Sequence, residues 1–82
     1  MREYLRDLRK SKNLTQKNIT ERTGIKGNYY SMIEAGLRQK NMSLTIMKKL
    51  ADALEVPIQV IVDEEEKFCE MSLISQSEAV NG

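Results

Sequence analysis

Residues 16–35 read QKNITERTGIKGNYYSMIEA and contain the pattern that is most informative about this 82-residue chain. Apolar residues recur at helical spacing on both sides of Gly24, which predicts two short helices joined by a tight turn. Thr15 is a favourable N-cap, so the first of them is expected over residues 16–23. Gly24 ends that helix because the turn needs a positive φ, and the second helix is expected over residues 27–35.

Helical spacing continues along the rest of the chain, and no strand pattern is apparent. Further helices are expected near residues 2–12, from a Ser43 cap through Leu54, and from Pro57 to about residue 62. Proline suits the first turn of the last helix, since its missing N–H would be unpaired there anyway. The sequence therefore predicts an all-α fold, a compact five-helix bundle over residues 1–62.

The expected core consists of apolar residues that repeat at three- and four-residue steps. It comprises Tyr4, Leu5, Leu8, Ile19, Ile25, Tyr30, Ile33, Leu44, Met47, Leu50, Ala51, Leu54, Ile58, Ile61 and Val62. Between helices, Asn13 suits a left-handed backbone, and Gly36 closes the helix of residues 27–35. Residues 37–42 then form a polar, basic loop.

The net charge of +1 conceals a strong asymmetry along the chain. Residues 1–50 hold 12 Lys and Arg against 4 Asp and Glu, a net charge of +8. Residues 51–82 hold 1 Lys against 8 Asp and Glu, a net charge of −7. A basic body suggests a polyanionic partner, although a solvated surface with randomly clustered charges would give the same counts.

The composition disfavours several classes of protein. Histidine is absent, which removes the commonest general base and the commonest metal ligand. Because the chain also has no phosphate loop and no cysteine–base pair, we expect no enzyme, no cofactor and no metal. Cys69 is alone and cannot form an internal disulfide, and there is neither a long apolar run nor a secretory signal. A cytoplasmic protein without membrane association is expected.

Two short helices around a glycine turn match the helix-turn-helix unit, and flanking residues extend the match. The matching positions are Leu5, Leu8, Arg9, Leu14-Thr15-Gln16, Gly24-Ile25, Tyr29 through Arg38, Ser43-Leu44 and Leu50 through Pro57. Over roughly residues 4–62 the chain resembles the lambda-repressor-like (XRE-type, Cro-like) helix-turn-helix family.

The chain departs from this family at Asn13, Thr20, Lys26 and Gly27. The family usually has, in the same order, a glycine, an alanine, a Ser/Thr cap and a longer polar side chain at those positions. Threonine at position 20 would open the packing between two helices slightly. Gly27 lowers the local helix propensity by about 1 kcal/mol relative to alanine, and it removes one side chain that could have read a base.

The resemblance implies a sequence-specific regulator that binds double-stranded DNA, with residues 27–35 in the major groove. Asn28 is the strongest candidate for reading a base, because an amide can bond adenine N6 and N7 together. Helix capping is the alternative role for Asn28. Met32 lies one turn further on and could either touch a thymine methyl or fill the core. Ser31 and Tyr29 carry hydroxyls that suit a phosphate or a base edge.

The remaining candidates are expected at DNA phosphates. They are Gln16, Lys17, Lys26, Arg38 and Lys40. Gln16 would act beside the free N–H groups of a helix start, although a solvated helix-start residue is the alternative. Surface lysines are as often merely solvated. The resemblance also implies a structural salt bridge between Arg9 and Glu34 that links the first and third helices.

A regulator of this family is expected to act as a repressor and to bind a palindromic operator as a homodimer. One small module reads too few bases alone, and dimers place their half-sites about 34 Å apart. The candidate dimer surfaces are the apolar residues of the last helix (Ile58, Val60, Ile61 and Val62) and the helical stripe of the tail (Phe68, Met71 and Ile74). Closure of the monomer core is the alternative role.

Residues 63–82 are expected to form an acidic, polar tail, frayed or disordered, with a weak helical stripe of Phe68, Met71 and Ile74. This tail supports a second hypothesis. The chain would be an antitoxin-type or interaction protein, whose helix-turn-helix serves autoregulation while the tail binds a partner protein.

Overall fold

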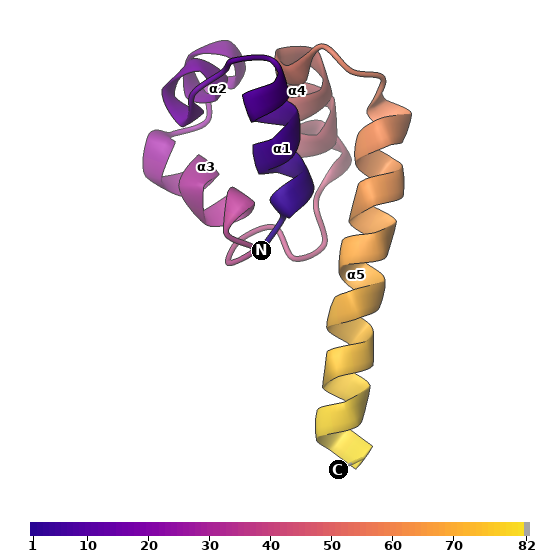
Figure 1. Ribbon diagram of the computed structural model, residues 1–82. Coiled ribbons are helices and arrows are strands. Elements are labelled where there is room, and N and C mark those ends of the chain that lie inside the picture. The colour runs from indigo at the N-terminus through magenta and orange to yellow at the C-terminus, as the bar shows by residue number, and fades with distance from the viewer. Residues whose placement is uncertain (82) are drawn as a thin grey trace.

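The computed structural model describes the backbone of residues 1–81 and the side chains of residues 1–69. Its five helices are α1 (Glu3–Ser11), α2 (Gln16–Thr23), α3 (Gly27–Glu34), α4 (Leu44–Leu54) and α5 (Ile58–Asn81) (Figure 1). No strand occurs among residues 1–81. The predicted all-α, five-helix fold is therefore confirmed.

The helices pack around one core. α3 packs against α1 and α2, and α4 packs against both α2 and α5. α5 runs beside the other four helices and continues beyond them (Figure 1). The fully buried apolar side chains are Leu5, Ile19, Tyr30, Ile33, Leu50, Leu54 and Ile61. These seven residues come from all five helices, so a single core holds the bundle together.

Local caps set the ends of the short helices, as the sequence predicted. Thr15 Oγ1 accepts a hydrogen bond from the Asn18 backbone N–H at 3.1 Å, and Asn18 Oδ1 accepts one from the Thr15 N–H at 2.9 Å. Ser43 Oγ caps α4 by accepting a hydrogen bond from the Ile46 N–H at 3.2 Å. Asn13 and Gly24 adopt the expected left-handed backbone, with φ of 57° and 77°.

One expected core residue lies at the surface. Leu44 is 59% exposed, whereas Met42, which was assigned to a polar loop, is 7% exposed. Leu44 is the first residue of α4, and helical side chains lean toward the N-terminus of their helix. The Leu44 side chain therefore reaches past the end of the bundle. Met42 precedes the Ser43 cap and packs into the core instead.

The last helix is much longer than the sequence predicted. We expected it to end near residue 62, but α5 spans Ile58–Asn81. The acidic residues that were expected to end it have partners on or beside the helix. Asp63 accepts a hydrogen bond from Gln59 at 2.8 Å, and Glu64 pairs with Lys67 at 3.3 Å. Glutamate is also a good helix former, so nothing interrupts the helix here.

The expected boundary at residue 62 therefore falls inside a helix. Pro57 immediately precedes α5 instead of lying in its first turn, a one-residue difference. Of the expected tail stripe, Phe68 is half-buried. Met71 and Ile74 lie outside the described side chains.

Gly27 and Gly24 should respond to alanine in opposite ways. A Cβ at position 27, the first residue of α3, would lie 4.0 Å from Thr20 Cγ2, an ordinary contact. Gly27→Ala should therefore raise the free energy of unfolding by up to about 1 kcal/mol. Gly24 has a φ of 77°, so Gly24→Ala should lower it by about 1 kcal/mol. Urea unfolding of both variants checks this, and destabilisation by Gly27→Ala would contradict it.

Candidate nucleic-acid interface

One side of α3 faces solvent and the other faces the core. The exposed side carries residues three or four apart, namely Asn28, Ser31, Met32 and Ala35 just past the helix end. The buried side carries Tyr30, Ile33 and Glu34. A helix has 3.6 residues per turn, so the core contacts dictate which side chains point outward. The exposed side therefore combines two polar side chains, Asn28 and Ser31, with two apolar ones, Met32 and Ala35.

The start of α2 offers unpaired backbone donors. The Thr15 side chain and carbonyl accept the N–H groups of Asn18 and Ile19, which leaves those of Gln16 and Lys17 ahead of the first helical bonds. Such N–H groups at the positive end of a helix dipole suit an anion. Lys17 is exposed and Gln16 is half-buried.

An ion pair joins α1 to the end of α3. Arg9 donates two hydrogen bonds to the Glu34 carboxylate, at 3.0 and 3.2 Å, and a third to the Leu14 carbonyl at 3.1 Å. The two side chains of the pair are only 11% and 4% exposed. This is the Arg9–Glu34 salt bridge that the family resemblance implied. It holds α3 at a fixed position relative to α1.

The ion pair keeps both partners charged. Burial alone would raise the pKa of Glu34, but hydrogen bonds from Arg9 and the Arg9 charge lower this pKa below its ordinary value. The hydrogen bond from Arg9 to Glu34 raises the pKa of Arg9. Burial and the Glu34 charge together raise the pKa of Tyr30, whose hydroxyl lies beside the pair without a well-aligned hydrogen bond to a described group. The pair is therefore ionised and Tyr30 is protonated at neutral pH.

The loop after α3 carries two exposed cations, Arg38 and Lys40. Gln39 between them has a φ of 55° and links the loop to both neighbouring helices. Its side chain donates a hydrogen bond to the Tyr29 hydroxyl at 2.7 Å and accepts one from the Ser43 N–H at 3.2 Å. Since the Tyr29 oxygen acts as the acceptor, its own hydrogen remains free to be donated.

A protein-family model described as helix-turn-helix matches residues 5–61, more than half of the chain. The chain belongs to the XRE-type, lambda-repressor-like helix-turn-helix family. Membership places it among DNA-binding transcriptional regulators. Searches of curated proteins and of solved structures found no match.

Within this helix-turn-helix domain, α2 and α3 form the motif, and α3 is its recognition helix. The residues expected at DNA lie mostly on the surface. Lys17, Lys26, Asn28, Ser31, Met32, Arg38 and Lys40 are exposed, and Gln16 and Tyr29 are half-buried. Their contact with DNA remains a prediction.

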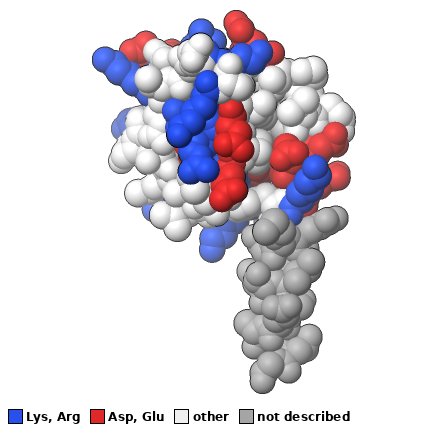
Figure 2. Space-filling view, in the orientation of Figure 1, with Lys and Arg blue, Asp and Glu red and all other residues white. Residues whose placement is uncertain are grey.

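The described part of α5 leaves the outer side of α3 uncovered. Figure 2 shows acidic side chains over the described part of α5, while mixed charges lie over α1. The side chains on the outer side of α3 remain exposed in the presence of α5. Among the described residues, no helix is long and apolar enough to cross a membrane, and no cluster of His, Cys, Asp or Glu is arranged to hold a metal.

Two buried charged residues on either side of the matched segment were not predicted from the sequence. Arg2 and Glu65 are 1% and 3% exposed and form an ion pair at 2.7 Å. They lie 63 positions apart, and Glu65 stands in an acidic run that was expected to be a tail. No local pattern could have found this pair, because each residue alone is typical of a solvated surface.

Proposed function

We propose that this chain is a transcriptional repressor that binds a palindromic operator as a homodimer and reads bases with the outer side of α3. The observation that carries the proposal is the exposed side of α3, with Asn28, Ser31 and Met32, in a chain of this family. Bound at an operator, such a protein denies the site to polymerase.

Asn28 is proposed to read a base. It is the second residue of α3, while the N-cap position belongs to Lys26, which makes no side-chain cap. The Asn28 side chain is exposed and has no hydrogen-bond partner among the described residues, which favours base reading over capping. Met32 is 36% exposed, which favours contact with a thymine methyl over a role as core filler.

The phosphate contacts are proposed to come from three places around α3. They are the start of α2 (Gln16 and Lys17), the N-cap position of α3 (Lys26) and the following loop (Arg38 and Lys40), while the hydroxyls of Tyr29 and Ser31 within α3 would reach either a phosphate or a base edge. Such contacts supply most of the affinity and little of the base preference, because every duplex presents the same phosphates.

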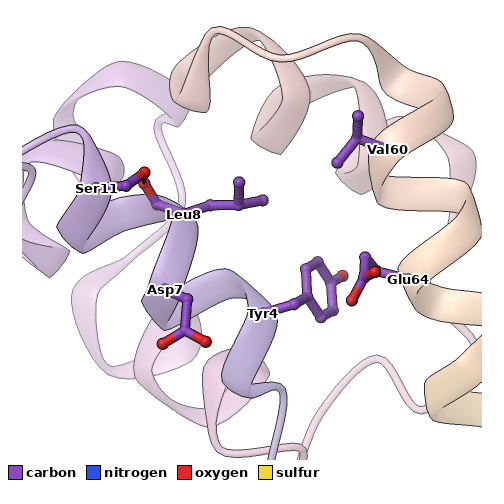
Figure 3. A pocket seen from close by; sticks show the side chains of 6 residues that line it. All are labelled: Tyr4, Asp7, Leu8, Ser11, Val60 and Glu64. Carbon is purple, nitrogen blue, oxygen red and sulfur yellow. Dashed lines mark hydrogen bonds between the residues drawn. The ribbon is translucent and has the colours of Figure 1, made fainter.

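The homodimer is proposed to use the surface of α5. Ile61 is fully buried and closes the monomer core, whereas Val60 is half-buried. Val60 lines a hollow of about 330 Å³ between α1 and α5, together with Tyr4, Leu8 and other residues (Figure 3). This hollow leaves apolar surface accessible to a second copy. The alternative hypothesis of a partner-binding tail is weakened, because Phe68 packs within this chain.

Selection of duplexes from a random pool tests the function and supplies the probe for a specific variant. Asn28→Ala should weaken binding to the selected duplex by about 1–3 kcal/mol and relax the preference at one base pair. Lys26→Ala, a matched control at the neighbouring surface, should weaken binding to selected and random duplexes alike. Fluorescence anisotropy measures both.

Equal losses on selected and random DNA for Asn28→Ala would remove the base-reading role. Failure to enrich any duplex would count against the proposed function as a whole. An enriched motif without two-fold symmetry would count against the homodimer alone.

A further inference from the structure

The guanidinium of Arg2 is fully buried, and each of its five N–H groups has an acceptor. Two of these N–H groups donate hydrogen bonds to the Glu65 carboxylate, from Nε at 2.7 Å and from Nη2 at 3.0 Å. The others go to three backbone carbonyls, those of Ile33 at 2.7 Å, Arg38 at 3.0 Å and Gln39. Arg2 therefore joins α5 to the end of α3 and to the loop beyond it.

Two more side chains of α5 contact the same segment. The Phe68 ring lies under the Arg2 guanidinium, and Arg2 Cζ is 4.3 Å from the centroid of that ring. The Phe68 ring also lies close to Gly36, 3.3 Å from the position of a Cβ there. Cys69 Sγ lies 3.5 Å from the Lys40 carbonyl oxygen. Since residues 65, 68 and 69 share one side of a helix, a single turn of α5 supports the loop.

The loop needs such support because it has little structure of its own. It adopts no helix between α3 and α4, and Gln39 holds a positive φ that costs a residue with a Cβ about 1 kcal/mol or more. Two consecutive carbonyls of the loop, those of Arg38 and Gln39, have Arg2 as their donor. The exposed side chains of Arg38 and Lys40 project from this same backbone.

We propose that Arg2, Glu65 and Phe68, together called the Arg2 cluster, are positioning residues for DNA binding. The cluster holds the loop of residues 37–42 so that Arg38 and Lys40 meet a phosphate. This inference rests on the proposed function, and it makes the beginning of the acidic segment part of the DNA-binding machinery. The cluster itself does not touch DNA, since its cation is buried and paired.

Two variants, Phe68→Leu and Glu65→Gln, test the role of the cluster. Phe68→Leu removes the ring without leaving a buried charge unpaired, so it should fold. Glu65→Gln removes one negative charge, and Glu66→Gln is its matched control on an exposed carboxylate of the same helix. A charge effect alone would strengthen DNA binding in both glutamine variants, whereas loss of positioning would weaken it in Glu65→Gln only.

Amide hydrogen exchange and the salt dependence of DNA affinity are the two measurements, made on the full chain with the selected duplex. Phe68→Leu and Glu65→Gln should speed exchange at residues 37–42 and leave residues 16–23 unchanged. The slope of log Kd against log salt should fall by about 1–2, the loss of one or two phosphate contacts. The base preference should be retained, and Glu66→Gln should show neither change in exchange nor a smaller slope.

The outcomes separate this inference from the proposed function. An unchanged slope in Phe68→Leu and Glu65→Gln overturns the positioning role, even where exchange in the loop is faster. A combined Arg38→Ala and Lys40→Ala variant should show the same reduction in the slope of log Kd against log salt. If that variant keeps the wild-type slope, the loop does not contact phosphate, and the proposed contacts of Arg38 and Lys40 fail together with the inference.

Discussion

Arg9→Met is expected to lower the free energy of unfolding by about 3–5 kcal/mol at pH 7. The Glu34 carboxylate is 4% exposed and would lose a partner that donates two hydrogen bonds to it. Methionine fills a similar volume, so the loss reports the unpaired buried charge more than a cavity. Urea unfolding measures it. Arg6→Met is the matched control, since Arg6 is 38% exposed and reaches Asp7 only at 4.0 Å, so it should change stability by about 0.5 kcal/mol or less.

The loss of unfolding free energy caused by Arg9→Met should be smaller at acidic pH. The pKa of Glu34 is lowered in the folded wild type, so its contribution to stability is present above the ordinary value of 4.5 and is lost as the pH falls through the lowered pKa. In the variant, burial without Arg9 raises this pKa, and protonation removes the buried charge. The difference in stability between the two proteins should therefore narrow from pH 7 to pH 4. A constant difference would mean that packing, and not charge, holds α1 to α3.

Ending the chain after Val62 is expected to cost about 3–5 kcal/mol relative to ending it after Cys69. The shorter chain loses Glu65 and Phe68, so the guanidinium of Arg2 stays buried without its carboxylate. The longer chain keeps these contacts to Arg2. Thermal and urea unfolding of both chains give the difference.

A second substitution shows how much of this lost stability comes from the unpaired charge of Arg2 and how much from the shorter helix. Adding Arg2→Met to the chain of residues 1–62 should recover part of the lost stability, since no buried cation then remains. If the chains of residues 1–62 and 1–69 unfold at the same urea concentration, Glu65 and Phe68 add nothing to the stability of the fold.

The parts of the fold that could be predicted from sequence are those with local causes. Thr15, Gly24 and Ser43 mark helix ends through bonds and backbone angles within a few residues of themselves. The apolar period of α3 places Tyr30 and Ile33 inside, and from this the outer position of Asn28 follows. Such signals agree with one another along residues 5–61, the part matched by the family model.

The parts that could not be predicted depend on contacts between distant segments. An acidic run looks like a solvated tail until a buried cation is known to face it, and Arg2 stands far from Glu65 in sequence. The left-handed φ of Gln39 and of Glu55 follows no glycine or asparagine signal, because neighbouring elements impose it. The burial of Met42 in place of Leu44 depends on where the edge of the bundle falls.

The separation of Arg2 from Glu65 also has a consequence for the order of events during synthesis. Glu65 leaves the ribosome 63 residues after Arg2, and Phe68 follows it, so the contacts of Arg2 with α5 are the last of its contacts to become possible. The first four helices can pack against one another earlier, since α1 to α4 are complete once Leu54 has emerged. The loop proposed to contact the DNA backbone would then reach its final shape only after Phe68 has emerged, and products that terminate before Glu65 would lack this shape.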